Sequence, residues 1–121
     1  MKNLNEVMLN AVDAATSVDS EVLEVCNLQN CSLQAVIEGA TTPNGTVKYQ
    51  VSNDKPLSEL APFTPTNWFD LTNASVSFTG SNGVKGTANI AISHHWLKAV
   101  YTYASGSGGT LTVSFHGNGQ S

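Results

Sequence analysis

Apolar and polar residues alternate in short runs along most of the chain, between Ser32 and His116. The apolar positions of these runs are Leu33, Ala35, Ile37, Val47, Tyr49, Val51, Val76, Phe78, Ala88, Ile90, Ile92, Leu97, Ala99, Tyr101, Tyr103, Leu111, Val113 and Phe115. A period of two residues sends alternate side chains to opposite faces of a strand, one toward a core and one toward water. The pattern therefore predicts an all-β domain, an antiparallel β-sandwich of two sheets packed face to face.

Turn-forming residues separate these runs into seven to eight expected strands. The strands are expected at Glu21–Val25, Ser32–Glu38, Thr46–Ser52, Trp68–Leu71, Ala74–Thr79, Thr87–Ile92, Trp96–Tyr103 and Thr110–His116. Turns are expected at Asn27–Asn30, Thr42–Gly45, Ser81–Gly83, Ser93–His95 (a brief helical turn) and Ser105–Gly109. Proline presets φ and glycine accepts a positive φ, so Thr42–Gly45 is expected to close a hairpin between Ser32–Glu38 and Thr46–Ser52.

The first twenty residues fit two interpretations. Their apolar side chains would share one face of a helix, at Leu4, Val7, Met8, Ala11 and Ala15. The run Thr16–Val18 and the residues after it favour an extended chain instead. We interpret residues 1–20 as an N-terminal arm or first strand, and residues 21–121 as the β-sandwich domain.

Composition adds information about the surface. The chain has 121 residues, enough for one domain with a sizeable core, and only 12% of them are charged, against about 25% in an average protein. Ser, Thr, Asn, Gln and Gly take the place of the missing charges. Neutral polar groups cost far less to bury than unpaired charges, so this surface suits packing against copies of itself or a larger assembly. The alternative is that it is an ordinary feature of an all-β domain.

Charge and hydropathy argue against two classes of partner. The net charge is −4, and the five basic residues are scattered lysines, with no arginine. Phosphate recognition relies on clustered Lys and Arg, so nucleic acid is not an expected partner. A membrane is not expected either, because no run approaches the roughly 20 apolar residues of a spanning helix. The N-terminus, with Lys2 and Glu6, does not resemble a secretory signal.

The titratable residues form no recognisable catalytic or metal-binding set. Cys26 and Cys31 lie five positions apart, which permits a disulfide across a turn, although two reduced thiols are favoured. His94 and His95 are adjacent and would point to opposite faces of a strand, and no spacing joins them to His116. We expect no metal, no cofactor and no enzymatic activity.

Two carboxylates have a simpler interpretation than catalysis. Asp54 and Asp70 are not spaced as a convincing pair for sugar hydrolysis. Each is expected to cap a loop turn by accepting hydrogen bonds from backbone amides.

The aromatic residues give the candidate contact sites. We expect Trp68 to fill the core. Trp96, Lys98 and Val100 share one face of their strand, opposite Leu97 and its neighbours, so they form a candidate subunit interface. Trp96 could instead stack on a sugar ring, or it could be the core end of its strand, in which case it would form no interface.

A second candidate contact lies on the expected surface loop Asn53–Thr66, which holds Pro56, Pro62 and Pro65. Prolines lower the entropy cost of docking a loop, so Phe63 and Pro65 are candidate interface residues. The alternative is an ordinary solvent-facing loop.

Four motifs in a fixed order resemble a known family. They are the runs GTVKYQVSND at Gly45–Asp54, WFDL at Trp68–Leu71, WLKAVYT at Trp96–Thr102 and GGTL at Gly108–Leu111. This order resembles small structural proteins of tailed bacteriophages over residues 11–116. The chain departs from that pattern in a longer, proline-rich insertion at Lys55–Asn67 and in carrying Trp at position 96.

The resemblance implies a jelly-roll-like sandwich built into a virion, as a head decoration, cement or fibre component. The implied partners are the major capsid protein or other virion proteins and further copies of the chain, with a trimer as one arrangement. The implied location is the virion, assembled in the cytoplasm of the host bacterium. The alternative function is a carbohydrate- or receptor-binding module of a tail or neck fibre.

Overall fold

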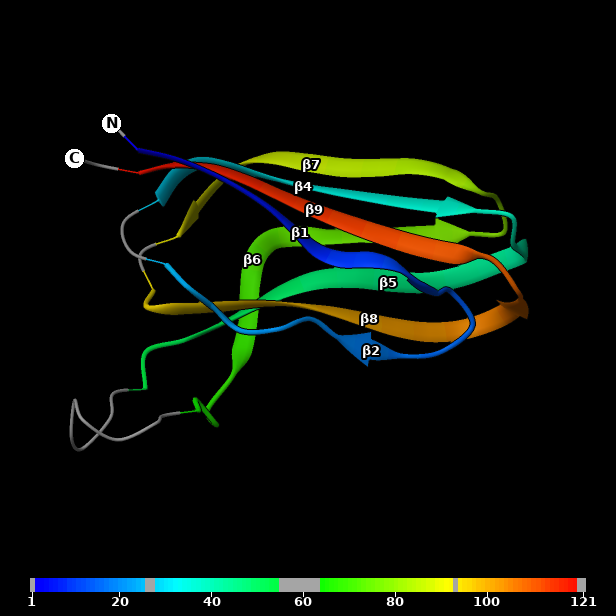
Figure 1. Cartoon of the computed structure of the whole chain (residues 1–121), viewed down its shortest axis with the longest axis horizontal. Coiled ribbons are helices and arrows are strands. Elements are labelled where there is room, and N and C mark those ends of the chain that lie inside the picture. The colour runs from blue at the N-terminus through cyan, green and yellow to red at the C-terminus, as the bar shows by residue number, and fades with distance from the viewer. Residues whose placement is uncertain (1, 26–27, 55–63, 93, 120–121) are drawn as a thin grey trace.

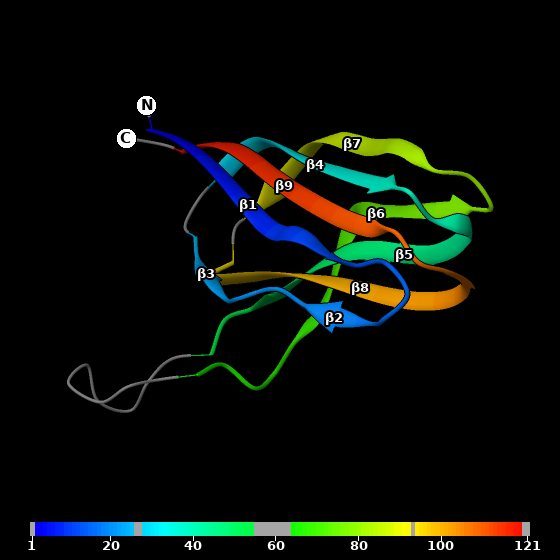
Figure 2. The same ribbon diagram turned by 45° about the vertical axis from the view of Figure 1, so that its right-hand side comes forward.

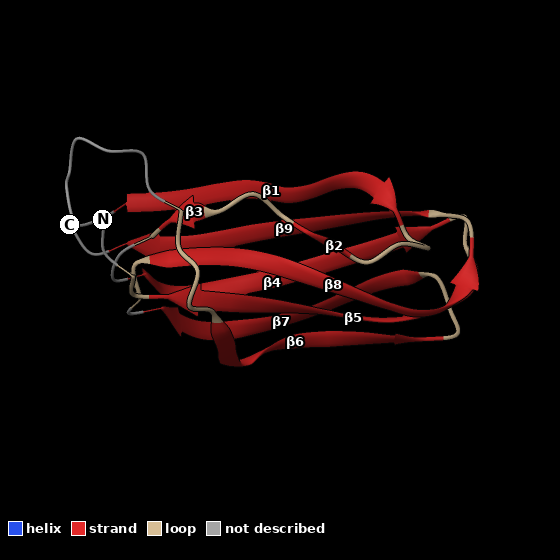
Figure 3. Ribbon diagram, turned by 90° about the horizontal axis from the view of Figure 1, so that it is seen from below, coloured by secondary structure: helices blue, strands red, loops and turns tan. Residues whose placement is uncertain are grey.

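The computed structural model describes residues 2–25, 28–54, 64–92 and 94–119, which form two antiparallel sheets stacked face to face (Figure 1). The strands are β1 (Lys2–Asp13), β2 (Val18–Asp19), β3 (Leu23–Glu24), β4 (Leu28–Glu38), β5 (Thr41–Ser52), β6 (Phe69–Thr79), β7 (Gly83–Ile92), β8 (Trp96–Ser107) and β9 (Thr110–Gly119). They run roughly along the long axis of the molecule, and no helix occurs in these ranges (Figure 3). The same ranges therefore contain no helix able to cross a membrane. The predicted all-β sandwich is confirmed.

The strand order is that of a jelly roll. One sheet, here called the β4 sheet, has the order β1-β9-β4-β7, and the other, the β5 sheet, has the order β2-β8-β5-β6 with β3 also paired to β8. Strands pair from the outside of the sequence inward: β1 with β9, β2 and β3 with β8, β4 with β7, and β5 with β6. This nested pairing wraps the chain into two Greek keys, as in a jelly roll.

The core lies between the sheets and follows the predicted alternation. Along β5 the side chains of Val47, Tyr49 and Val51 are fully buried, while Thr46, Lys48 and Gln50 between and before them are partly exposed. Tyr49 crosses the core, and its ring meets Phe115 of the opposite sheet edge to face, with centroids 5.7 Å apart. Burying aromatic surface on both sheets holds the two layers together.

Lys2–Asp13 joins the β4 sheet as its edge strand. It pairs with β9 from Lys2 opposite Gly119 to Asp13 opposite Thr110, with irregularities near Val7, Leu9 and Val12. Because the first strand pairs with the last, the two ends of the chain lie side by side (Figures 1 and 2). The segment is extended, so its apolar residues do not form a helical face.

The predicted hairpin around Thr42–Gly45 is wrong. The chain turns earlier, at Gly39 (φ 71°) and Ala40, and then crosses from the β4 sheet to the β5 sheet, with Thr42–Gly45 inside β5. A Cβ on Gly45 would lie 2.8 Å from Cε1 of Tyr101. The glycine therefore allows β5 to lie close to β8. In the sequence, a glycine in this role looks the same as a glycine in a turn.

Two further strand predictions need correction. Phe69–Leu71 and Ala74–Thr79 belong to one strand, β6, which continues through an irregularity at Asn73 (φ 61°) and is sharply bent (Figure 1). An asparagine tolerates this left-handed conformation, so the polar interruption marks a bulge and not a strand end. The expected strand at Glu21–Val25 shortens to Leu23–Glu24, and the described residues of Ser93–His95 form a bend.

The short strand β3 belongs to a segment that lines the edge of β8. Some of its contacts use serine side chains where a regular strand would use backbone carbonyls: the β8 amide of Tyr103 donates to Oγ of Ser17 (2.9 Å), and that of Ala99 donates to Oγ of Ser20 (2.8 Å). These serine oxygens give the backbone amides at the edge of β8 their hydrogen-bond acceptors, so little regular strand is needed beside it.

Candidate functional site

The predicted interface stripe of β8 faces outward. Trp96, Lys98 and Val100 are each partly exposed, whereas Leu97 and Ala99 between them are fully buried. Two residues of the proline-rich loop, Phe63 and Pro65, were also predicted as interface residues. Pro65 is buried, and Phe63 lies outside the described residues.

The ammonium group of Lys98 is already held inside the chain. Its Nζ lies 3.0 Å from Oδ2 of Asp19 on β2 and 4.6 Å from the centroid of the Trp68 ring. The Lys98 side chain is 15% exposed. Its charge is thus satisfied by a carboxylate and by the face of an aromatic ring.

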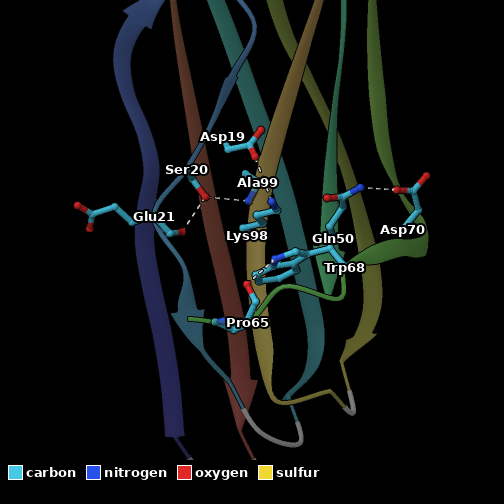
Figure 4. A network of polar contacts seen from close by, with 9 residues as sticks. All are labelled: Asp19, Ser20, Glu21, Gln50, Pro65, Trp68, Asp70, Lys98 and Ala99. Carbon is cyan, nitrogen blue, oxygen red and sulfur yellow. Dashed lines mark hydrogen bonds and ion pairs between the residues drawn. The ribbon is translucent and has the colours of Figure 1, made fainter. Parts of the chain in front are cut away.

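Trp68 does not fill the core, so that prediction is wrong. It is partly exposed on the outer face of the β5 sheet, where its Nε1 donates to the backbone oxygen of Pro65 at 3.2 Å (Figure 4). The reason is positional: β6 begins at Phe69, so Trp68 lies just before the pleated strand and is not directed between the sheets. Tyr49, Tyr101, Phe78 and Phe115 supply the large aromatic side chains of the core.

A row of polar side chains continues across the sheet from Lys98. Gln50 on β5 lies opposite Lys98 on β8 and opposite Asp70 on β6. The Gln50 amide donates to Oδ1 of Asp70 at 2.9 Å, and Nζ of Lys48 lies 3.1 Å from the same oxygen. We call Trp68, Lys98, Gln50, Asp70 and Lys48 the Trp68 face.

Asp70 remains accessible within this row. Its side chain is 61% exposed, and hydrogen bonds from Gln50 and then from Lys48 lower the pKa of its carboxyl group. Asp70 therefore interacts with side chains across the sheet, and the prediction that it caps a loop turn is wrong.

The cap prediction is confirmed for Asp54. One of its carboxylate oxygens accepts hydrogen bonds from the amides of Thr66 (2.8 Å) and Asn67 (2.9 Å), which lowers the pKa of the carboxyl group. The backbone oxygen of Asp54 also accepts a bond from Nε1 of Trp96 at 2.9 Å. These bonds join the two ends of the proline-rich loop to β8, next to the Trp68 face.

The histidines are distributed over both sheets. Nε2 of His95 lies 2.8 Å from Oε2 of Glu24, and the His94 ring meets Phe69 edge to face at 5.2 Å. His116 is on the outer face of the β4 sheet, where its Nδ1 contacts the amide oxygen of Asn5. In the parts of the chain that the structure describes, no group of three His, Cys, Asp or Glu side chains could hold a metal ion.

Of the two cysteines, Cys31 lies within the described residues. Cys31 is buried in the core, and burial raises the pKa of its thiol to about 11. Cys26 lies outside the described residues.

The outer face of the β4 sheet was not predicted as a site. Its side chains form three cross-strand rows: Asn5, His116 and Ser32; Val7, Ser114 and Gln34; and Thr112, Val36 and Val84. None of these residues is Asp, Glu, Lys or Arg. Val7 is 57% exposed and Val84 is 64% exposed. We call this set the neutral face.

The neutral face contains an open hollow of about 300 Å³. Asn5, Glu6, Val7, Gln34 and Ser114 are among its lining residues, so one carboxylate residue borders this face. This site could not be predicted from the sequence, because alternation identifies outward residues without showing which strands lie next to each other. The one related signal in the sequence was the low charge of the chain as a whole, because β1, β4 and β7 themselves carry Lys2, Glu6, Asp13, Glu38 and Lys85.

No family model and no curated protein matches the chain. Among solved structures it is similar to chitosan-binding module 1 of a chitosanase/glucanase from Paenibacillus sp. IK-5, with 17% identity over 94% of this chain and 92% of that chain and a TM-score of 0.46. It is also similar to module 2 of the same enzyme in complex with chitotriose (19% identity, 92% and 90% coverage, TM-score 0.43) and to FLHE (11%, 98% and 95%, TM-score 0.39). Likeness at this level does not decide between functions.

Proposed function

We propose that this chain is a non-enzymatic structural protein of a tailed-phage virion, a decoration or cement protein that binds the head lattice and its own copies. Support comes from the order of the four sequence motifs and from the jelly-roll topology, an architecture that occurs in viral capsid and lectin domains. The proposed partners are the major capsid protein or other virion proteins.

The observation that carries this proposal is the neutral face. Docking a partner on the side chains of the neutral face desolvates amides, hydroxyls and an imidazole, and the polar cost stays small where Glu6, the carboxylate that borders the hollow, remains in water. Burying a fully exposed valine side chain stabilises a complex by roughly 1.5–3 kcal/mol, and Val7 and Val84 are both more than half exposed. Each interface of this kind is modest, and repetition over a lattice adds the contributions.

The direct test is mass spectrometry of gradient-purified particles of the phage that encodes the chain, followed by cosedimentation of the purified protein with heads that lack it. We expect the chain in the particle and saturable binding to the heads. A particle without the chain, together with heads that do not bind it, would overturn the proposal.

A second candidate is a carbohydrate- or receptor-binding module of a tail or neck fibre. It is favoured by the Trp68 face, where a partly exposed indole lies beside an exposed carboxylate and an amide. Aromatic surface with a few placed polar groups is the usual composition of small-molecule sites. A glycan array probed with the labelled protein separates the two functions, since only the second predicts specific binding.

A further inference from the structure

We propose that the Trp68 face is a binding site for one or two rings of a neutral saccharide. This inference rests on the second candidate function above and specifies its site and its ligand class. Trp68 supplies the apolar platform, and Gln50 and Asp70 supply the hydrogen bonds. The argument begins with how the indole is held.

Trp68 is fixed in place by contacts within the chain. Its Nε1 donates to Pro65, which is buried, and Lys98 lies against the ring at 4.6 Å from the centroid. The indole therefore loses little freedom when a ligand binds, which lowers the entropy cost of association. Because its one hydrogen-bond donor is already used, the ring contributes apolar surface, which suits the C–H face of a pyranose.

Gln50 and Asp70 offer hydrogen bonds of the kind that hydroxyl groups need. Asp70 accepts a hydrogen bond from Gln50 on Oδ1 and one from Lys48 on Oδ2 (3.2 Å), yet its side chain remains 61% exposed, so its carboxylate can accept further hydrogen bonds. The Gln50 amide has an acceptor oxygen as well as its donor group. Adjacent hydroxyls of a sugar ring can donate to the carboxylate and exchange hydrogen bonds with the amide.

The charges of the face select a neutral ligand. Lys98 is paired with Asp19, and Lys48 is paired with Asp70, so each ammonium group has a carboxylate within about 3 Å. An anionic sugar would meet no uncompensated cation, and a cationic sugar would compete with the two lysines for their carboxylates. The balance leaves an uncharged polyhydroxylated ligand as the best match.

The dimensions fit a short saccharide. Lys98, Gln50 and Asp70 lie on three neighbouring strands, so the row spans about 10 Å at a strand spacing of about 4.8 Å. That length accommodates one or two pyranose rings. Figure 4 shows Trp68 lying across Lys98 beside Gln50, with Asp70 beyond it on the next strand.

The test is an NMR titration of the ¹⁵N-labelled protein with three neutral trisaccharides: maltotriose, cellotriose and N-acetylchitotriose. The trimer of glucosamine and trigalacturonate serve as the cationic and anionic comparisons. We expect at least one neutral probe to bind with a dissociation constant on the order of 1 mM and to shift the Trp68 indole resonance. Its affinity should change little between low and high salt, because no net charge is neutralised.

Three variants assign the site. Trp68→Ala and Gln50→Ala should each weaken binding about tenfold or more, whereas Val84→Ser on the neutral face should bind as the wild type does. If Trp68→Ala disturbs the nearby loop, Gln50→Ala still tests the site, because Gln50 is on strand β5 and not in that loop.

The proposal is overturned if none of the three neutral probes binds, if only a charged probe binds, or if neutral binding survives both Trp68→Ala and Gln50→Ala. Neutral binding that survives both substitutions would keep the glycan-binding function but move its site elsewhere. All of these outcomes leave the particle test of the first proposed function untouched, because that test concerns the opposite sheet.

Discussion

At the residue scale, tyrosine hydroxyls form hydrogen bonds between parts of the sandwich. Side-chain packing alone would not specify how these parts are aligned. The hydroxyl of Tyr49, on the β5 sheet, donates to the backbone oxygens of Ser32 (3.2 Å) and Ser114 (3.3 Å) on the β4 sheet. That of Tyr101 donates to the backbone oxygen of Ala14 at 2.7 Å. A hydroxyl buried this deeply costs stability unless it is bonded, so these contacts fix how the sheets are aligned.

Replacing Tyr49 by phenylalanine tests this alignment. The substitution leaves the carbonyls of Ser32 and Ser114 without this donor, and we expect the free energy of unfolding to fall by about 1–2 kcal/mol. Urea denaturation followed by tryptophan fluorescence measures the change. Ser77→Ala on the exposed face of β6 is the control and should lie within about 0.5 kcal/mol of the wild type; an equal loss in both variants would contradict the account.

The same buried groups predict a loss of stability in alkali. Burial raises the pKa of the Cys31 thiol to about 11, and burial followed by the nearby Cys31 raises the pKa of the Tyr49 phenol. Above about pH 9 the unfolded chain releases these protons while the folded chain keeps them, so stability falls as the pH rises.

Urea midpoints should therefore be level between pH 7 and about pH 8 and should decrease above about pH 9. In Cys31→Ala the decrease should start at a higher pH, near the ordinary tyrosine pKa of about 10. A midpoint that stays constant to pH 11 in the wild type would show that these groups titrate alike in both states.

Trp68 shows what residue patterns could not predict. Alternation correctly placed the β8 side chains, because each position in a strand fixes the face of the next. Trp68 lies just outside a strand, where that rule does not apply, and its surface position depends on Pro65 and Lys98. Large apolar residues next to strand ends are therefore where hydrophobicity is the weakest guide to burial.

At the element scale, the connections matter more than the strands. Most long strands were predicted near their observed positions, but β4 and β5 were expected to pair directly and instead lie in different sheets. A local turn signal cannot show whether two consecutive strands share a sheet. In this chain Pro43 and Gly45 lie inside β5, and the chain changes sheet at Gly39 and Ala40.

One asparagine holds two of these connections together. The side chain of Asn82, in the turn between β6 and β7, accepts a bond from the amide of Ala40 (2.9 Å) and donates to its carbonyl (2.8 Å). It thereby pairs with the β4–β5 turn as a backbone strand partner would. Asn82 thus joins two turns that are 42 residues apart in the sequence.

We expect Asn82→Ala to reduce the free energy of unfolding by about 1 kcal/mol, since both hydrogen bonds are lost but the groups are accessible to water. Hydrogen exchange should show the main effect at the amide of Ala40. The neighbouring Ser81→Ala is the matched control. Faster exchange of Ala40 in the control, or unchanged exchange in Asn82→Ala, would contradict the assignment.

At the scale of the whole molecule, the jelly-roll wrapping creates two outer faces of different character. The β4 sheet presents the neutral face, where Val7 and Val84 are exposed among amides and hydroxyls. The β5 sheet presents paired charges and Trp68. The low overall charge was visible in the sequence. The gathering of uncharged side chains on one face depends on β1, β9, β4 and β7 becoming neighbours.

The most direct test of the central claim is cosedimentation of wild-type protein and of Val84→Asp with heads that lack the chain. Val84 is exposed on an outer face, so the aspartate variant should fold, which circular dichroism verifies. The account predicts that Val84→Asp binds heads at least about tenfold more weakly, because a carboxylate would be buried without a partner, whereas Trp68→Ala binds like the wild type. Equal binding of wild type and Val84→Asp would show that the neutral face is not the docking surface.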